Sequence, residues 1–343
     1  MQNSVQNDIR ANPSQRTLRS SAPVFVVGCP RSGTTYLYHV LLSAGDFAIY
    51  RAESQVFHLL EPRFGDLSVP TNRRELLAAW FKSRLFTATG LQRESLESRI
   101  VAECRNGGDF LRIVMEETAQ HQGMKRWAEC TPDHILYLPR IKHTIPNALV
   151  IHIIRDGRDV AVSMERQGWP KQLPWDRTRR RMAGGLYWRW MVQAGRRDGV
   201  QLGSDYLEVR YEDLVSKPRE VLAGLSAFVD QELDYDVIQR AGIGSVSRPN
   251  SSFRDENTGE SFNPVGRWKK LYSPAEAAMF QRLVGKTLLD LGYESSVDAE
   301  RETLDLKLSL LRAQYKAFFA GKFHLKTKTP LGRYLVTRDL SRM

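Results

Sequence analysis

The stretch VFVVGCPRSGTT, residues 24–35, constrains the fold more than any other part of the chain. Four apolar, mostly β-branched residues at 24–27 predict a buried strand of a parallel sheet, and the run 36–42 has the length and spacing of a helix. Between them lies a glycine-bounded turn, residues 28–35. In such a unit, backbone N–H groups and the positive end of the helix dipole converge on one point, which suits a phosphate-like anion. The alternative is a tight turn that holds no ligand.

The turn has the glycine spacing of a Walker A loop but lacks the lysine of that loop. Gly28 and Gly33 stand as in GxxxxGK[ST], and Thr34 occupies the lysine position. Because that lysine reaches the β- and γ-phosphates, its absence argues against ordinary ATP or GTP cleavage. Arg31, inside the turn, is the candidate for the missing positive charge.

The rest of the chain alternates strands with helices. Further strands are predicted at residues 47–51, 125–130, 148–154 and 205–214, and a mainly helical region at 54–122 is interpreted as a cap. The pattern predicts an α/β fold with a P-loop-like parallel sheet flanked by helices, and ligands at the carboxyl ends of the strands. We divide the chain into a flexible N-terminal arm (1–22), an α/β domain (23–293) and a basic amphipathic C-terminal segment (294–343).

Cysteine usage and hydropathy indicate a cytoplasmic protein. Cys29, Cys104 and Cys130 are widely spaced and fit neither a disulfide framework nor a zinc motif. No apolar run approaches the length of about 18 residues that a membrane span requires. The polar N-terminus lacks the apolar core of a secretory signal.

Most of the net positive charge lies at the C-terminus. Residues 306–343 hold nine Lys or Arg and one Asp, which is +8 of the net +11. A helical stripe there (Leu304, Leu308, Leu311, Tyr315, Phe318) is interpreted as packing on the body of the protein or on a second copy in a homo-oligomer, with membrane-surface contact as the alternative. The basic run 171–181 is interpreted as a solvated surface, or as a surface that attracts an anionic acceptor. No nucleic-acid motif accompanies this charge, so nucleic acid is not expected as a partner.

Three segments, taken together, resemble the sulfotransferases that use 3′-phosphoadenosine 5′-phosphosulfate (PAPS). They are the lysine-less loop, a strand ending at Arg155 with Ser163 eight residues later, and the segment Gly266-Arg267-Trp268-Lys269. The loop is similar to that of the PRSGTT branch, which includes tyrosylprotein and many bacterial sulfotransferases. The resemblance extends over about residues 23–293.

The resemblance implies a nucleotide site and a reaction. PAPS would be the sulfuryl donor and 3′-phosphoadenosine 5′-phosphate (PAP) the product, without a metal, and the acceptor would be a hydroxyl of a small molecule, glycan or lipid that the sequence does not identify. The 3′-phosphate is assigned to Arg155 and Ser163, with Tyr211 near the nucleotide. The implied contacts to the 5′-phosphosulfate come from Arg31, Ser32, Gly33, Thr34 and Thr35, and those that close over the 3′-phosphate and adenosine come from Arg267, Trp268 and Lys269.

Sulfuryl transfer needs cations to stabilise the leaving oxygen and a general base for the acceptor hydroxyl. Arg31 is the catalytic cation implied here. Glu53 matches the catalytic glutamate of the tyrosylprotein branch and is the first candidate for the base. His58 and His134 are the other candidates.

The chain departs from the family's pattern at Cys130, and from the tyrosylprotein branch at Gln167, where that branch has an arginine four residues after the 3′-phosphate serine. Cys130 stands where the family's EKTPxH segment has a lysine, so Arg31 or Lys125 would have to compensate. Glu129 is interpreted as a possible partner of an arginine, and the charged residues of 156–159 as salt-bridge partners. Two rival functions stay open: a P-loop phosphotransferase, and a catalytically weakened nucleotide-binding protein.

Overall fold

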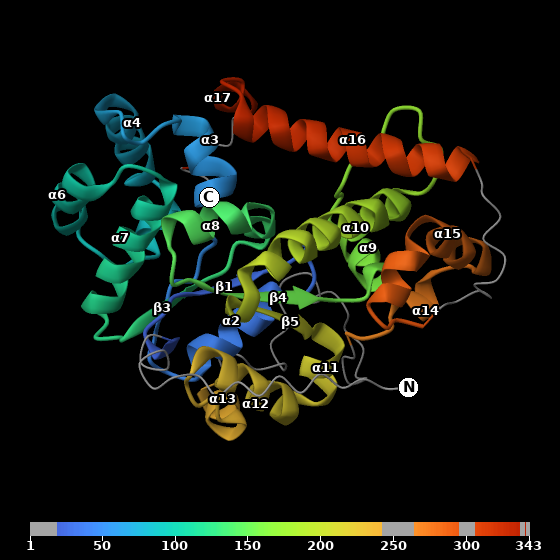
Figure 1. Cartoon of the computed structure of the whole chain (residues 1–343), viewed down its shortest axis with the longest axis horizontal. Coiled ribbons are helices and arrows are strands. Elements are labelled where there is room, and N and C mark those ends of the chain that lie inside the picture. Colours follow the sequence, from blue (N-terminus) through green and yellow to red (C-terminus); the bar gives the residue numbers. More distant parts are fainter. Residues whose placement is uncertain (1–18, 242–263, 295–305, 337–339, 341–343) are drawn as a thin grey trace.

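A five-stranded parallel sheet lies at the centre of the computed structural model, which describes residues 19–241, 264–294, 306–336 and 340 (Figure 1). The strand order is β2–β3–β1–β4–β5, and every adjacent pair is parallel. All strands therefore end at the same edge, which confirms the predicted α/β fold. The strands are β1 Val24–Val27, β2 Phe47–Ala48, β3 Arg126–Glu129, β4 Leu149–Ile154 and β5 Tyr206–Arg210.

Two strands are shorter than their sequences predict. The strand predicted at 47–51 stops at Ala48, because the side chain of Gln122 takes both backbone groups of Ile49, at 2.7 Å and 3.0 Å. The strand predicted at 205–214 ends at Arg210. Helix α11 (Tyr211–Ser216) starts directly after it, with Glu212 and Asp213 in its first turn, where carboxylates favour a helix.

Helices cover both faces of the sheet, so alternate side chains of β1 enter different cores. Val24 and Val26 pack with α2 (Thr34–Ser43) and α12 (Pro218–Val229). Phe25 and Val27 belong to the larger core formed with α7 (Gly107–His121) and α10 (Arg180–Gly199). The strand is thus buried on both sides, as its continuous apolar run predicts. The connecting helices are η2 Pro132–Tyr137, α8 Leu138–Thr144, α9 Gly157–Arg166, η3 Val200–Asp205, α13 Tyr235–Ala241, α14 Trp268–Leu271 and α15 Pro274–Asp290.

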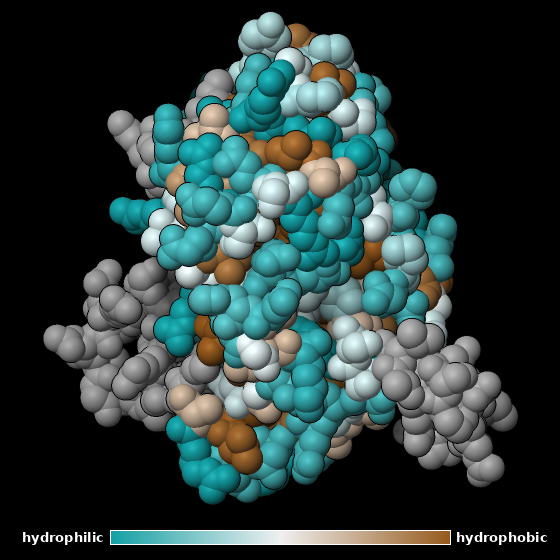
Figure 2. Space-filling view, turned by 90° about the vertical axis from the view of Figure 1, so that its left-hand side faces the viewer, coloured by the Kyte–Doolittle hydropathy of each residue, from teal (hydrophilic) through white to brown (hydrophobic). Residues whose placement is uncertain are grey.

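The region 54–122 consists of helices on the β2 side of the sheet (Figure 1). Apolar residues such as Leu76, Leu77 and Trp80 are buried. The face that these helices present to solvent is mainly hydrophilic, with small scattered apolar spots (Figure 2). Besides α7, the helices are η1 Val56–Leu60, α3 Glu61–Phe64, α4 Pro70–Trp80, α5 Arg84–Thr87 and α6 Arg93–Glu103.

The C-terminal segment packs on the body of the protein. Helix α16 (Leu306–Lys328) lies along α10, and α17 (Gly332–Leu335) contacts α3 (Figure 1). Leu308 and Tyr315 are buried as predicted, but Phe318 is 44% exposed and Phe319 takes the buried position instead. The predicted position was wrong because the helix turns a neighbouring residue toward α10. Leu304 and most of the predicted N-terminal arm lie outside the described residues.

A loop from the basic run is held under α16. The hydroxyl of Tyr315 donates to Asp176 Oδ2 at 2.7 Å and accepts from the backbone N–H of Leu173 at 3.1 Å. Leu173 is buried, so the run 171–181 is only partly a solvated surface. Within the described part of the chain, no helix is long and apolar enough to cross a membrane.

Candidate functional site

The turn between β1 and α2 has a backbone shape that opens the start of the helix. Arg31 and Gly33 both have positive φ, 74° and 96°. A Cβ atom at Gly33 would lie 2.3 Å from Cδ2 of Tyr211, so only glycine lets that ring lie against the turn. Helix α2 has no side-chain cap, and the first N–H groups of a helix lack intrahelical acceptors. Ser32 Oγ is also buried without a hydrogen-bond partner in the part of the chain described, so the turn fits an anionic ligand.

The strand register brings Arg155 and Tyr211 to this turn. Val27 lies opposite His152, and Ile154 lies opposite Arg210, so the residues that follow β1, β4 and β5 share one edge. Arg155 Nη1 donates to the carbonyl of Arg31 at 3.1 Å. The Arg155 guanidinium lies over the Tyr211 ring, with its carbon 4.6 Å from the ring centroid.

Arg31 and Ser163 are in direct contact. Arg31 Nε donates to the Oγ of Ser163, which lies in the second turn of α9, at 3.0 Å. Burial and then Arg155 lower the pKa of the Arg31 guanidinium, while Glu53 raises it. Arg155 Nε is buried with no hydrogen-bond partner among the described residues. Two guanidinium groups thus lie close together, and their positive charge is suited to a polyanion.

The segment around Trp268 is fixed by Asp159, whose role the sequence did not reveal. Its carboxylate accepts the backbone N–H groups of Gly266 and Trp268, both at 2.8 Å. Burial raises the pKa of Asp159, and Arg155 opposes this shift. The salt bridge predicted within 156–159 is present between Arg158 and Asp156 at 2.8 Å, but Asp159 binds backbone instead. The second aspartate of RDGRD was the available signal, since it lies in the same short motif as Arg155.

The three residues of the predicted closing segment differ in exposure. Trp268 is buried beneath the guanidinium of Arg158, whose carbon lies 3.8 Å from the ring centroid. Arg267 is half-buried and Lys269 is exposed. Arg155 Nη2 donates to the carbonyl of Pro264 at 2.6 Å, so Arg155 connects this segment with the turn between β1 and α2.

Glu53 stands near the loop. Glu53 is exposed to solvent, and Gln55 Nε2 donates to the Oε2 of Glu53 at 2.5 Å. The charge of Glu53 influences the pKa values of both Arg31 and Cys130, which places the carboxylate within electrostatic reach of both. The structure therefore brings the first candidate base to the end of the sheet where the arginines gather.

The two histidines have other partners. His134 is buried, and its Nδ1 lies 2.9 Å from Glu129 Oε2. Burial acts to raise the pKa of Glu129, but His134 and then the hydroxyls of Thr131 and Ser54 lower it below the ordinary value. The partner of Glu129 is thus a histidine and two hydroxyls, not the arginine that the sequence suggested. His58 Nε2 lies 3.1 Å from Lys326 Nζ, on the side facing α16.

Cys130 brings no charge to the site. Burial, followed by Glu129 and Glu53, raises the pKa of its thiol well above the ordinary value, so the thiol is neutral. Lys125 does not replace the family lysine, because it precedes β3 whereas Cys130 follows it, about 16 Å further along an extended strand. Lys125 is 79% exposed and faces Asp46. Arg31 is the predicted compensating cation that the fold does place at the site.

These features define an α/β protein with a P-loop-like core, in which the turn lacks the Walker lysine and two arginines lie beside it. The model of the sulfotransferase family matches residues 23–235, and the chain belongs to this family. Among the described residues, no group of three or more His, Cys, Asp or Glu side chains is arranged to hold a metal ion.

Comparison with solved structures gives the same fold. The sulfotransferase domain of the curacin biosynthetic pathway is 19% identical, covers 80% of this chain and 98% of its own, and superposes with a TM-score of 0.51. A mouse sulfotransferase in complex with PAP is 16% identical, with coverages of 86% and 90% and a TM-score of 0.44. Sulfotransferase STF9 from Mycobacterium avium is 16% identical, with coverages of 80% and 78% and a TM-score of 0.44. Comparison with curated protein sequences gives no match.

Proposed function

We propose that this sulfotransferase transfers a sulfuryl group from PAPS to an acceptor hydroxyl of a small molecule, glycan or lipid, and that it belongs to the PRSGTT branch. The observation that carries the proposal is the contact of Arg31 with Ser163 and Arg155 beside the uncapped start of α2. A nucleotide with phosphate groups at both its 3′ and 5′ positions matches a site with two guanidinium groups and a row of helix N–H groups. Family membership supports the same chemistry.

The proposed contacts follow the arrangement of the fold. Arg155 and Ser163 would hold the 3′-phosphate, and Tyr211 would lie near the nucleotide, where its ring already supports Arg155. When bound, PAPS supplies the sulfuryl group. The 5′-phosphosulfate would be held by Arg31, Ser32, Gly33, Thr34 and Thr35, and the 3′-phosphate and adenosine would be covered by Arg267, Trp268 and Lys269.

Two residues would carry the chemistry. Arg31 offsets the negative charge that develops on the leaving oxygen, because its guanidinium is fixed in advance by Ser163. Glu53 takes the proton of the acceptor hydroxyl, since it is the carboxylate that stands within electrostatic reach of Arg31. Cys130, as a neutral thiol, contributes no charge to either step.

The neutral Cys130 favours a second candidate, a protein that binds the nucleotide but transfers sulfate weakly. The two candidates differ in turnover and agree in nucleotide binding. Transfer of labelled sulfate from PAPS to any member of an acceptor panel would exclude the second candidate.

The Glu53→Gln variant tests the assignment of the base. Loss of a general base typically lowers turnover by about 10²–10⁴-fold, so we expect the rate of transfer to fall by about that factor. The affinity for PAP should stay within about twofold, because Glu53 is not assigned to the nucleotide. Glu75→Gln, at an exposed glutamate of α4, is the matched control and should change neither quantity. Full turnover by Glu53→Gln would show that Glu53 is not the base.

A further inference from the structure

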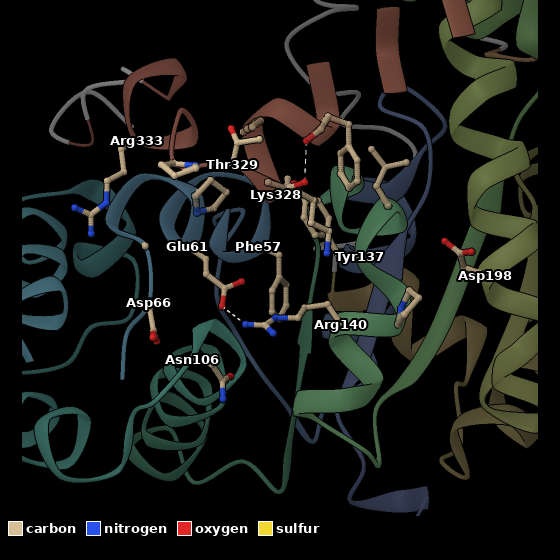
Figure 3. A pocket seen from close by; sticks show the side chains of 18 of the residues that line it. Phe57, Glu61, Asp66, Asn106, Tyr137, Arg140, Asp198, Lys328, Thr329 and Arg333 are labelled. Atoms are coloured by element: carbon tan, nitrogen blue, oxygen red, sulfur yellow. Dashed lines mark hydrogen bonds and ion pairs between the residues drawn. The ribbon is translucent and has the colours of Figure 1, made fainter. Parts of the chain in front are cut away.

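A cavity of about 810 Å³ lies between the C-terminal helices and the helical region around α3 and α8 (Figure 3). Its size falls within the range of about 300–1,000 Å³ that small-molecule sites occupy. Phe57, Tyr137 and Phe323 form an aromatic wall. The residues that line it include none of those assigned above to the nucleotide or to catalysis. It is therefore distinct from the candidate nucleotide site.

The C-terminal segment closes this cavity. Arg333 Nη2 donates to the carbonyl of Phe64 at 2.8 Å and to Asn72 Oδ1 at 2.7 Å, which fastens α17 to α3 and α4. The ring of Phe323 packs edge-on against that of Tyr137, with the centroids 5.2 Å apart. The family model ends at residue 235, so the side of the cavity formed by α16 and α17 lies outside the family match.

The cavity has a positive lining. Six cationic side chains face three acidic ones, Glu61, Asp66 and Asp198. Glu61 is already bonded to Arg140 and to the backbone N–H of Gly107, and Asp198 to Arg197. Lys328 has no ion-pair partner among the described residues, which leaves its charge available to a ligand. The cations are Arg105, Arg140, Arg197, Lys326, Lys328 and Arg333.

The aromatic wall carries an unused polar group. Tyr137 is 7% exposed, and its hydroxyl has no hydrogen-bond partner within the described part of the chain. Phe57 stacks on it, with the ring centroids 6.2 Å apart and the planes 27° from parallel. Burying a hydroxyl without a hydrogen-bond partner costs free energy, so a ligand that supplies such a partner is favoured.

We propose that this cavity binds an amphipathic organic anion, with its aromatic or hydrocarbon body against Phe57, Tyr137 and Phe323 and its anionic group beside Lys328. A purely inorganic anion would leave the aromatic wall uncovered, and a neutral apolar molecule would leave the positive charge unmatched. The site is distinct from the proposed nucleotide site and does not depend on sulfate transfer.

Titration calorimetry of the full-length protein with 2-naphthoate tests this proposal, because this anion is neither an acceptor nor a product of sulfate transfer. We expect one bound molecule per chain, with or without PAP present, and about tenfold weaker binding of uncharged 2-naphthamide. Displacement of the probe by PAP would overturn the proposal, because the probe would then occupy the nucleotide site. Absence of binding, or equal binding of 2-naphthamide, would overturn it as well.

Two pairs of variants on α16 locate the probe. Lys328→Ala should weaken binding about fivefold or more, whereas Lys322→Ala, at an exposed lysine that does not line the cavity, should not. Phe323→Ala should remove one side of the aromatic wall and weaken binding, whereas Phe318→Ala, at an exposed position that does not line the cavity, should leave binding intact. Equal behaviour within both pairs would contradict the proposal. Thermal unfolding of each variant shows whether the fold is kept.

Discussion

Replacing Gly33 by alanine should lower the free energy of unfolding through two separable effects, backbone strain and a steric clash. The first is backbone strain, because Gly33 has φ 96° and a residue with a Cβ atom costs about 1–2 kcal/mol in a left-handed conformation. The second is steric, because the new Cβ atom would lie 2.3 Å and 2.6 Å from two atoms of the Tyr211 ring. Overpacking of this kind costs about 1–3 kcal/mol.

Gly45→Ala measures the backbone strain alone. Gly45 has φ 80°, and a Cβ atom there would meet no atom within 4 Å. We therefore expect Gly45→Ala to lower the free energy of unfolding in urea by about 1–2 kcal/mol, and Gly33→Ala to lower it by about 1–3 kcal/mol more. Only Gly33→Ala should weaken PAP binding, by about tenfold or more, since Tyr211 supports Arg155.

A double-mutant cycle checks the cause. If the clash with the ring is responsible, Gly33→Ala should cost less in a Tyr211→Leu background than in the wild type. The reasoning would be refuted if Gly33→Ala and Gly45→Ala lost the same stability. It would also be refuted if the cost of Gly33→Ala did not depend on Tyr211.

Three further predictions concern pH, charge and the closing segment. Burial lowers the pKa of His152 to about 3, so below about pH 6.5 the unfolded chain binds a proton that the folded chain does not. The free energy of unfolding should therefore fall by about 2 kcal/mol between pH 6.5 and 5. His152→Gln should remove this part of the pH dependence of the free energy of unfolding, measured in urea at each pH. Because the Cys130 thiol is neutral, Cys130→Ala should keep kcat within about threefold and leave the pH–rate profile unchanged, and a steep loss would show that a thiolate takes part. Asp159→Ala removes the acceptor of two backbone N–H groups and should weaken PAP binding about tenfold with little change in kcat, and an unchanged affinity would contradict the role given to Asp159.

The fold could be predicted from the sequence because its central strands, β1 and β4, are short and mainly apolar runs that are buried on both faces. The run at 24–27 and the turn at 28–35 need only local information, and the structure has β1 and α2 where they were predicted. Strand ends were harder to predict. The side chain of Gln122, 73 residues away in the sequence, terminates β2, and no local pattern contains that contact.

The candidate site was predictable in its members but not in its contacts. The sequence placed Arg31 in one motif and Arg155 with Ser163 in another, and only the parallel register of β1 and β4 shows that the two motifs meet. The predicted partner of Glu129, an arginine, was wrong because a buried carboxylate can accept a hydrogen bond from any donor that the fold brings near. The role of Asp159 was missed because its carboxylate accepts backbone N–H groups, and the sequence does not show which backbone groups the fold brings near.

The most direct test of the central claim is the affinity of the full-length protein for PAP compared with ADP, measured by titration calorimetry without and with magnesium. The cluster of Arg31, Arg155 and Ser163 should favour a nucleotide that carries a 3′-phosphate. We therefore predict that PAP binds about 100-fold or more tightly than ADP, that magnesium does not change this ratio, and that Arg155→Ala together with Ser163→Ala removes the preference. Equal affinities, or tighter binding of ADP in the presence of magnesium, would contradict the proposed site.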